Sequence, residues 1–419
     1  MRVMRRLVTF ILAGGKGERL LPLTNDRAKP AVPFGGIYRI IDFTLSNCVN
    51  SGIRRIHVLV QYKSISLLRH LRLGWNIFDA QLGEYIDVIP AQQRIGGDWY
   101  LGTADAIFQN IYTIEQEKPD IVLILAGDHV YKMDYLKMVN FHQESAADVT
   151  IGVVPMPKTK SKFLGVVQVD KKNGVHGFEE KPQHPHTIPE DKDNIYASMG
   201  IYVFNRDVLE EELNEDAAKK NKHDFGKDVI PQMIKNKRNL LAYNFIEPED
   251  SRPCYWRDIG TIDAYYEANM DLLKPNPIFN LYDNDWPIRT YQEQFPPAKT
   301  VFTGAKNVGS AGLIVNSLIA GGSIFSGKIL RNSVLSYNVC LAGESEVYDS
   351  ILLEGVRVGE SARIKNAIID KDVTIPDKMV IGYDKADDKK KFEITDSGIV
   401  IVPKGTKISE ATTYGAKRT

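Results

Sequence analysis

The chain has 419 residues, a length at which two domains are expected rather than one ordinary hydrophobic core. Lysine and arginine together number 53, as do aspartate and glutamate, so the balanced charge favours neither nucleic acid nor an anionic membrane as a partner. No stretch approaches the roughly 18 apolar residues that a membrane helix needs. Three widely separated cysteines, Cys48, Cys254 and Cys340, lack metal-ligand spacing, which predicts reduced thiols and a cytoplasmic protein.

The first predicted element is a buried strand at residues 8–12, and a glycine-rich loop follows it. Glycines leave the backbone N–H groups open to a ligand, so such a loop can cradle phosphates. A plain turn would explain the glycines alone, but two cations in the same segment favour a nucleoside triphosphate. The residues concerned are Gly14, Gly15, Gly17, Arg19 and Lys29.

Strand and helix patterns alternate from this loop to about residue 275. Further strands are predicted at residues 56–61, 121–125, 149–154 and 199–204. One helix is predicted from Asp42 as N-cap to a stop at Gly52, and another from Thr103 as N-cap with Ile107, Ile111 and Ile114 on its apolar face. This alternation predicts an α/β sheet with helices on both faces and ligands beyond the carboxyl ends of the strands.

After a Pro-, Asn- and Asp-rich stretch, helical patterns disappear and a repeat replaces them. Aliphatic residues recur at six, six and five residues, a period of 17 that predicts a three-sided parallel β-helix. An irregular β-sandwich is the alternative. The repeat contains Leu335, Leu341, Val347, Leu352, Val358, Ile364, Ile369, Ile375 and Ile381, with Leu318, Ile324 and Leu330 as a looser earlier coil. The predicted domains are therefore 1–275, a linker at 276–300, and 301–419.

Two aspartates are candidates for holding a metal ion. Asp128 directly follows the buried strand at 121–125, and Asp258 lies in the segment Tyr255-Trp-Arg-Asp-Ile-Gly-Thr261. Carboxylates of this kind suit Mg²⁺, which keeps water and phosphate oxygens among its ligands. A turn or cap role is the other interpretation of each residue alone. His129 is expected to be structural.

The whole string from Gly14 to Ala31 resembles the signature of the sugar-phosphate nucleotidyltransferases. Longer segments narrow the resemblance to the bacterial glucose-1-phosphate adenylyltransferases, and it covers nearly the whole chain. These segments are Pro90-Ala-Gln-Gln-Arg94, Trp99-Tyr-Leu-Gly-Thr-Ala-Asp-Ala106, Phe178-Glu-Glu-Lys-Pro182, Ala197-Ser-Met-Gly-Ile-Tyr-Val-Phe204, His223-Asp-Phe-Gly-Lys-Asp228 and Trp286-Pro-Ile-Arg-Thr290.

This resemblance implies a Rossmann-like domain of GT-A type followed by a left-handed parallel β-helix of hexapeptide repeats. It implies that Mg²⁺, ATP and glucose 1-phosphate are bound and that ADP-glucose and pyrophosphate are formed, for glycogen synthesis. Arg19 and Lys29 would stabilise the departing pyrophosphate, and Asp128 would be catalytic. The substrate contacts it implies are Gly14, Gly15, Gln92 or Gln93 for adenine, Tyr100 on the nucleotide, Gly165, Glu180 on the sugar, Lys181 on the sugar phosphate, and Ser198.

Members of this family are commonly allosteric homotetramers that bind anionic effectors. Arg27, Arg39 and Lys371 are candidates for an effector site in this chain. Two other functions remain open from the sequence. The chain could transfer another nucleotide or use another sugar phosphate, or it could be a non-catalytic subunit that regulates a related partner.

Overall fold

The computed structural model describes residues 6–92, 99–247, 249, 252–301 and 312–408. By their contacts the residues group into two compact units. The sheet unit comprises Met1–Lys16, Ile41–Trp256 and Asp285–Ile288; the solenoid unit comprises Gly17–Ile40, Arg257–Asn284 and Arg289–Thr419. The glycine loop is therefore divided between the units after Lys16, and the linear boundaries expected from the sequence remain predictions.

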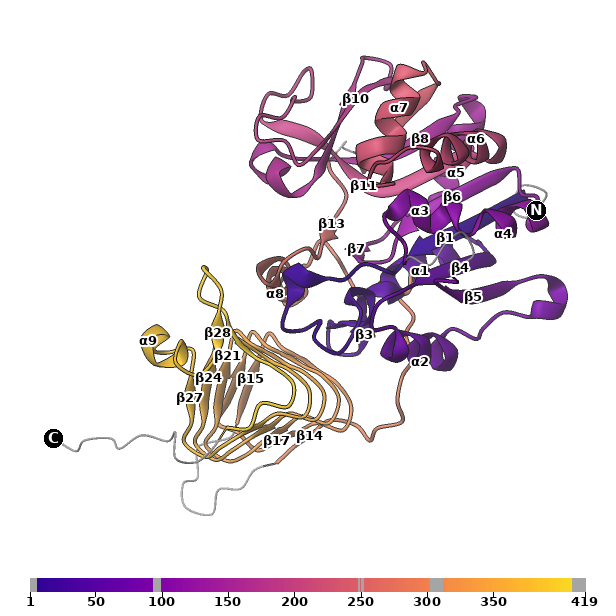
Figure 1. Cartoon of the computed structure of the whole chain (residues 1–419). Helices are drawn as coiled ribbons and strands as arrows, with labels where there is room; N and C mark the ends of the chain where they lie inside the picture. The colour runs from indigo at the N-terminus through magenta and orange to yellow at the C-terminus, as the bar shows by residue number, and fades with distance from the viewer. Residues whose placement is uncertain (1–5, 93–98, 248, 250–251, 302–311, 409–419) are drawn as a thin grey trace. The chain divides into compact units, whose positions relative to one another are not determined.

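A mixed β-sheet forms the centre of the sheet unit, with strands in the order β10, β9, β11, β6, β1, β4, β5 (Figure 1). Strand β8 pairs with both β11 and β12. The strands are β1 Leu7–Leu12, β4 Arg55–Val60, β5 Tyr85–Pro90, β6 Ile121–Ala126, β8 Val149–Pro157, β9 Gly165–Val169, β10 Val175–Glu180, β11 Asn194–Asn205 and β12 Leu240–Asn244. All five strands predicted in this part of the chain are present, and β11 begins earlier than expected because it pairs with β8 and β9 as well as β6.

Helices cover this sheet with their apolar faces. Side chains of α3, α4, α6 and α7 share one buried core with residues of β1 and β6. The helices of the unit are α1 Ile40–Asn50, α2 Ile65–Gly74, α3 Thr103–Phe108, α4 Ile111–Glu117, α5 Tyr135–Glu144, α6 Arg206–Ala217 and α7 Ile230–Lys235. The class of fold predicted from the alternating patterns is thus confirmed.

Two predicted helix caps are wrong. Asp42 lies inside the first turn of α1, where its Oδ1 accepts a hydrogen bond from Trp75 Nε1 at 2.9 Å and lies 2.6 Å from His70 Nε2. Thr103 is the first residue of α3 rather than its cap, and its hydroxyl donates to Asp224. In both cases the polar side chain forms a hydrogen bond with a partner distant in the sequence. The local pattern had predicted that it would cap the helix by bonding to a backbone N–H.

The solenoid unit contains a three-sided parallel β-helix, seen as stacked coils in Figure 1. Its three parallel ladders are β14-β17-β20-β23-β26, β15-β18-β21-β24-β27 and β16-β19-β22-β25-β29. The strands are β14 Lys299–Thr300, β15 Leu313–Val315, β16 Leu318–Ile319, β17 Ile324–Phe325, β18 Ile329–Arg331, β19 Val334–Leu335, β20 Cys340–Leu341, β21 Glu346–Tyr348, β22 Ile351–Leu352, β23 Arg357–Val358, β24 Arg363–Lys365, β25 Ala367–Ile369, β26 Thr374–Ile375, β27 Val380–Ile381 and β29 Val400–Val402. Helices α8 (Ile262–Asp271) and α9 (Lys385–Asp388) belong to the same unit.

All nine residues of the strict repeat point into this core and are at most 2% exposed. The prediction for the looser earlier coil is wrong by one residue at two of its three inward-facing positions. Ile319 pairs with Leu335, and Phe325 pairs with Leu341, so that Ile324 is 41% exposed. The spacing to the next coil is 16 residues there, and a shift of one residue in a strand turns each side chain to the other face.

A ladder of serines connects successive coils at one corner. The backbone N–H of Ser350 donates to Ser333 Oγ at 3.2 Å, and the N–H of Ala367 donates to Ser350 Oγ at the same distance. Asn332, Asp349 and Asn366, which precede these positions, all have φ near +47°. Asparagine and aspartate tolerate this left-handed conformation, which explains the dipeptides that recur with the repeat.

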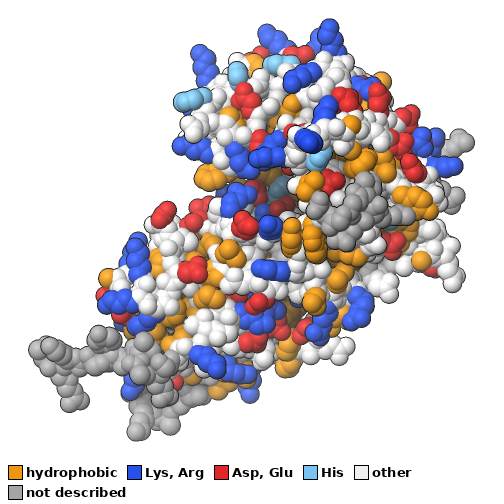
Figure 2. Space-filling view, viewed as in Figure 1, with side chains coloured by type: hydrophobic (Ala, Val, Ile, Leu, Met, Phe, Trp, Pro, Cys, Tyr) orange, Lys and Arg blue, Asp and Glu red, His pale blue; other side chains and the backbone are white. Residues whose placement is uncertain are grey.

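Within the described residues, no helix is long and apolar enough to span a lipid bilayer. The three cysteines are free, and only Cys48 is fully buried. On the face drawn in Figure 2, acidic and basic side chains are interspersed, as the equal totals of the sequence lead one to expect.

Replacing Ser350 by alanine should destabilise the solenoid unit by about 1–3 kcal/mol, because the buried N–H of Ala367 loses its acceptor. The measurement is the free energy of unfolding from urea titrations. Thr374→Ala, at an exposed position of β26, is the matched control and should change it by less than about 0.5 kcal/mol. Equal effects of the two substitutions would contradict the role of the ladder.

Candidate active site

The glycine loop and Asp128 follow neighbouring strands of the sheet unit. Leu12 at the end of β1 pairs with Ala126 at the end of β6, so Gly14 and Asp128 each lie two residues beyond the paired positions. The N–H of Gly127 donates to Leu12 O at 3.1 Å. A Cβ on Gly127 would lie 3.0 Å from Ile11 Cγ2 and 3.2 Å from Leu12 O, so glycine eases this close approach of the two segments. Both candidates therefore lie at the carboxyl edge of the sheet, where ligands of α/β sheets bind.

The carboxylate of Asp128 is 30% exposed, and its Oδ1 lies 3.4 Å from His129 Nε2. The His129 ring packs edge-on against Trp256, with ring centroids 5.0 Å apart. The carboxylate therefore follows a buried strand and still reaches solvent. A partly exposed carboxylate is compatible with the predicted role as a metal ligand.

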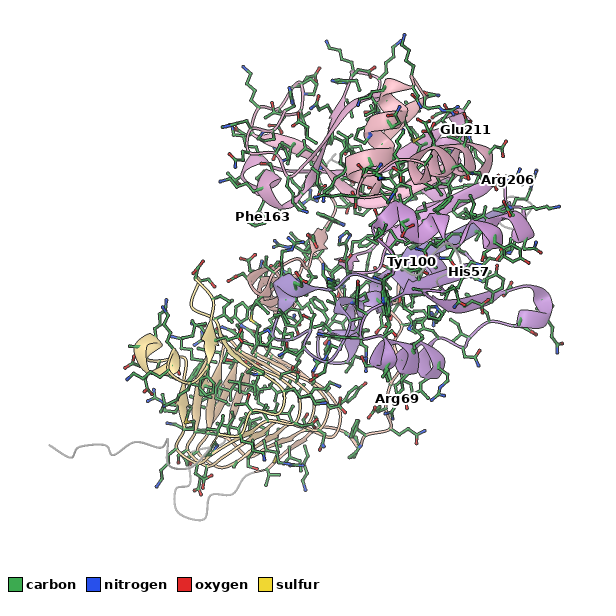
Figure 3. All side chains as sticks on the ribbon, in the orientation of Figure 1. His57, Arg69, Tyr100, Phe163, Arg206 and Glu211 are labelled. Carbon is green, nitrogen blue, oxygen red and sulfur yellow. The ribbon has the colours of Figure 1, made fainter. Side chains whose placement is uncertain are left out.

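Hydrogen bonds fix Tyr100 at both its backbone N–H and its side-chain hydroxyl. The side chain of Tyr100 is labelled in Figure 3. The N–H of Tyr100 donates to Gln61 Oε1 at 2.8 Å, and its hydroxyl accepts from Asn110 Nδ2 at 3.1 Å. Burial raises the pKa of Tyr100, so the phenol stays protonated at neutral pH. Gln92 is exposed and its amide donates to Pro90 O at 2.9 Å. Gln93 lies outside the described residues.

The segment that carries Tyr100 is fixed by the motif at His223. The carbonyl of His223 accepts from the N–H groups of Ala104 and Asp105 at 2.9 and 3.2 Å, which satisfies two donors at the first turn of α3. A Cβ on Gly102 would lie 2.2 Å from the same oxygen. The two motifs therefore form one folded feature, although more than 100 residues separate them.

Three of the predicted sugar-side residues lie in register where β9 begins, where β10 ends and in the interior of β11. Gly165 on β9 pairs with Glu180 on β10, and Ala197 on β11 pairs with Val166, so Ser198 is next in register with Gly165. A Cβ on Gly165 would lie 2.8 Å from Phe178 Cζ and 3.1 Å from Glu180 Oε2. The glycine thus leaves room for the Glu180 carboxylate. The register of β11 shifts directly after Ser198, and such irregularities often re-aim side chains at sites.

Lys181 has an unusual backbone conformation. Its φ is +53°, a region that non-glycine residues rarely adopt, and its N–H donates to Leu164 O at 3.1 Å. Its Nζ lies 2.6 Å from Glu180 Oε1, and the side chain is 42% exposed. The surrounding bonds hold a conformation that costs about 1 kcal/mol or more, and such residues cluster at functional sites.

The solenoid unit brings together the other three candidates. Lys29 Nζ forms an ion pair with Asp258 Oδ1 at 3.2 Å, and both side chains are largely buried. A Cβ on Gly260 would lie 2.8 Å from Asp258 Oδ2 and 3.4 Å from Arg19 Nη1. Arg19, Lys29 and Asp258 therefore lie close to one another around Gly260. The two cations that predicted a triphosphate site in the sequence are thus brought to the same carboxylate.

Gly17 makes this arrangement possible. Its φ is +67°, and a Cβ there would lie 3.1 Å from both Lys29 Cβ and Thr24 Cγ2. The Thr24 hydroxyl donates to Gly17 O at 2.9 Å and closes the turn. The third glycine of the loop is thus required by packing in the solenoid unit.

Two of the three predicted effector residues are paired with carboxylates. Arg27 Nη2 donates to both oxygens of Asp370, at 2.9 and 3.0 Å, and both side chains are buried. Lys371 bonds to Glu354 through its ammonium group. Arg39 lies on β3, which is Tyr38–Arg39, and is half-buried.

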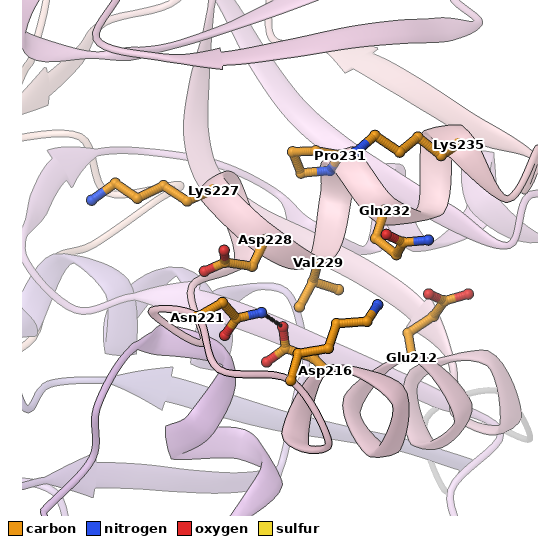
Figure 4. A pocket seen from close by; sticks show the side chains of 10 residues that line it. Glu212, Asp216, Asn221, Lys227, Asp228, Val229, Pro231, Gln232 and Lys235 are labelled. Atoms are coloured by element: carbon orange, nitrogen blue, oxygen red, sulfur yellow. Dashed lines mark hydrogen bonds between the residues drawn. The ribbon is translucent and has the colours of Figure 1, made fainter.

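A polar pocket between α6 and α7 of the sheet unit is separate from every predicted site residue (Figure 4). Its Asp216 carboxylate accepts from Asn221 Nδ2 at 2.6 Å and contacts His223 Nδ1 at 2.8 Å. These bonds support the segment that fixes α3. The pocket is lined by Glu212, Asp216, Lys219, Asn221, Lys227, Asp228, Val229, Pro231, Gln232 and Lys235.

Gln61 is a further candidate site residue, and the sequence motifs do not point to it. Gln61 follows the end of β4 directly, and Asp128 follows the end of β6 by two residues. Gln61 Oε1 accepts a hydrogen bond from the N–H of Tyr100. A Cβ added to Gly14 would lie 3.2 Å from Gln61 Cβ. The signal was present, because a buried strand that ends in a polar residue is the pattern that identified Asp128.

Known proteins resemble this chain over nearly its whole length. Residues 8–275 match the family model described as nucleotidyl transferase, and residues 296–402 match the C-terminal hexapeptide model named for GlmU-like proteins. A glucose-1-phosphate adenylyltransferase of Koribacter versatilis is 50% identical over 403 residues, which are 96% of each chain. A relative of that name from Rhodopirellula baltica is 50% identical over 97% of this chain and 92% of its own length.

The glucose-1-phosphate adenylyltransferase 2 of Vibrio cholerae is 49% identical over 97% of this chain and all of its own length. These matches confirm the resemblance predicted from the glycine loop and the longer motifs. They also agree with the mixed sheet and the stacked parallel ladders of the structure. By both its family model and these relatives, the chain belongs to the glucose-1-phosphate adenylyltransferase family of nucleotidyl transferases.

Proposed function

We propose that this chain converts ATP and α-D-glucose 1-phosphate into ADP-glucose and pyrophosphate, and so supplies ADP-glucose for glycogen synthesis. The observation that carries the proposal is the near-complete coverage by relatives that bear the name of this activity. The cluster of Arg19, Lys29 and Asp258 supports it, because two cations held close together suit a pyrophosphate leaving group. The meeting of Gly165 with Glu180 supports it as well.

The proposed reaction is an in-line displacement at phosphorus. A phosphate oxygen of glucose 1-phosphate attacks the α-phosphorus of ATP, and the bond from that phosphorus to the oxygen bridging to the β-phosphate breaks as pyrophosphate leaves. The substrate itself is the nucleophile, so the chain must position the two phosphates and balance their charge. Arg19 and Lys29 balance the charge on pyrophosphate, and the ion pair with Asp258 fixes the Lys29 ammonium group.

Nucleotidyl transferases of this family generally use a divalent metal ion, and we propose Mg²⁺ with Asp128 and Asp258 as its protein ligands. Both are carboxylates with exposed area, 30% for Asp128 and 17% for Asp258, so the donor set fits a hard cation. Bound Mg²⁺ would neutralise phosphate charge in the transition state. The two ligands belong to different units, and their sharing of one ion stays a prediction.

Substrate recognition is assigned to residues at the edge of the sheet. The N–H groups of Gly14 and Gly15 contact the triphosphate, and Tyr100 packs on the nucleotide while the amide of Gln92 reads adenine. Lys181 binds the sugar phosphate, and Glu180 and Ser198 contact the sugar. The contact between Lys181 and Glu180 supports a joint role, since the carboxylate holds the ammonium group in one orientation.

We also propose that the enzyme is a homotetramer regulated by anions. Arg27, Arg39 and Lys371 remain the candidates for an effector site. The pairing of Arg27 with Asp370 and of Lys371 with Glu354 implies that an effector must compete with internal carboxylates for these cations.

The first test of the function is a panel of nucleotides with glucose 1-phosphate. Formation of the sugar nucleotide should be at least about tenfold faster, in kcat/KM, with ATP than with UTP, dTTP or GTP. Preference for another nucleotide would support the alternative transferase, and the absence of product with all four would support a regulatory subunit.

Asp128→Asn should lower kcat for ADP-glucose formation by at least about a hundredfold, because the metal loses a charged ligand. Circular dichroism and size-exclusion elution should stay unchanged, since asparagine keeps the size of the Asp128 side chain. Asp87→Asn, at an exposed position of β5, is the matched control and should retain activity. Retained activity of the Asp128 variant would refute the assignment.

Lys181→Gln should raise the KM for glucose 1-phosphate about tenfold and leave the KM for ATP nearly unchanged, because a charge-assisted contact to the sugar phosphate is lost. Lys171→Gln, in the turn at the other end of the β9 and β10 hairpin, removes an equal charge and should change neither value. An equal rise for both substrates would argue against this role.

A further inference from the structure

Lys16 is a cation of the glycine loop to which the proposed function gives no task. It lies between Gly15 and Gly17 and is exposed to solvent. Its Nζ is 5.4 Å from the centroid of the Tyr62 ring. This distance is within the range of a cation–π interaction, so the side chain has a preferred orientation.

Tyr62 reaches Lys16 because of the order of the strands. Leu12 at the end of β1 pairs with Leu59 near the end of β4, and the N–H of Ala13 donates to Leu59 O at 2.9 Å. Lys16 and Tyr62 therefore follow the ends of adjacent parallel strands by four and two residues. Both lie at the carboxyl edge of the sheet, beside the loop that is predicted to hold the triphosphate.

A second ring holds Tyr62 in place. Trp99 stacks on it, with ring centroids 5.4 Å apart and the planes inclined by 13°. Gln61, the residue before Tyr62, accepts the N–H of Tyr100, and its side chain touches the position of Gly14. The dipeptide Gln61-Tyr62 thus contacts the glycine loop on one side and the Trp99-Tyr100 segment on the other.

We infer that Lys16 binds the triphosphate of the nucleotide, and that Tyr62 is a positioning residue that holds the Lys16 ammonium group at the glycine loop before the nucleotide arrives. This inference rests on the proposed function and assigns a further part of that site. A lysine on a flexible stem loses rotamer freedom when it binds phosphate, and orienting it beforehand lowers that cost. The aromatic face attracts the cation without neutralising it, so its charge stays available to an anion.

A matched set of variants tests both roles. Lys16→Gln removes the cation, Tyr62→Leu removes the aromatic face, Tyr62→Phe keeps that face, and Lys16→Gln with Tyr62→Leu combines the two losses. Lys137→Gln, at an exposed position of α5, is the control for the loss of one positive charge. The measurements are the KM values for ATP and glucose 1-phosphate, the KM for pyrophosphate in the reverse reaction, and ATP binding by calorimetry without sugar phosphate.

Lys16→Gln should raise the KM values for ATP and pyrophosphate about five- to tenfold and leave that for glucose 1-phosphate within about twofold. Tyr62→Leu should raise the same two values about threefold, and Tyr62→Phe should resemble the unmodified chain. The double variant should be no weaker than Lys16→Gln alone, because Tyr62 acts through Lys16. ATP binding by calorimetry should weaken in the same order.

Three results would overturn the inference. They are an unchanged ATP affinity in Lys16→Gln, an equal effect of Lys137→Gln, and fully additive effects in the double variant, which would mean that Tyr62 acts independently of Lys16. If the unmodified chain forms no sugar nucleotide from any nucleotide, the proposed function fails instead. The calorimetric comparison of ATP binding still tests Lys16 and Tyr62 in that case.

Discussion

Strand β1 hydrogen-bonds in parallel to β4 on one side and to β6 on the other, with Leu12 opposite both Leu59 and Ala126. The three strands therefore end at the same edge of the sheet, and the segments that follow them begin there. The register therefore determines that the glycine loop, the residues after Leu59 and Asp128 are neighbours. A slip of one residue would turn their side chains to the other face, and the buried strands make such a slip costly.

In the solenoid unit, the basic side chains that follow the glycine loop are paired with acids distant in the sequence. Lys29 Nζ lies 3.2 Å from Asp258 Oδ1. Both carboxylate oxygens of the buried Asp370, in the β-helix, accept hydrogen bonds from Arg27 Nη2. Removing one partner of such a buried pair leaves an uncompensated charge, so each pair specifies a geometry more than it adds stability.

Further hydrogen bonds join the same loop segment to helix α8. The hydroxyl of Tyr265 donates to Pro33 O at 2.7 Å, and the N–H of Gly35 donates to Asn269 Oδ1 at 2.9 Å. Tyr266, also on α8, donates to Asp349 O at a corner of the β-helix. Hydrogen bonds therefore join the loop segment to helix α8, and helix α8 to the β-helix.

Patterns of side chains along the chain were sufficient for five strands of the sheet and for the strict coils of the β-helix. The strands and the strict coils were predictable because burial requires aliphatic residues at a fixed period, and Leu335, Val347 and Ile369 follow it without exception. Prediction failed where the period changes to 16 residues, at Ile319 and Phe325, since nothing local marks a lost residue. The predicted helix caps at Asp42 and Thr103 were also wrong, because both side chains form hydrogen bonds with residues distant in the sequence.

The sequence alone determined the class of fold, the repeat and the family, because each depends on local spacing or on motifs that are contiguous in the chain. Only the tertiary structure decided which candidates meet: Lys29 with Asp258, Gly165 with Glu180, and Tyr100 with Gln61. It also decided that Arg27 and Lys371 are paired, which their positive charge alone does not indicate. The physical reason is that long-range contacts are selected by packing and strand register, and these involve residues far apart in the sequence.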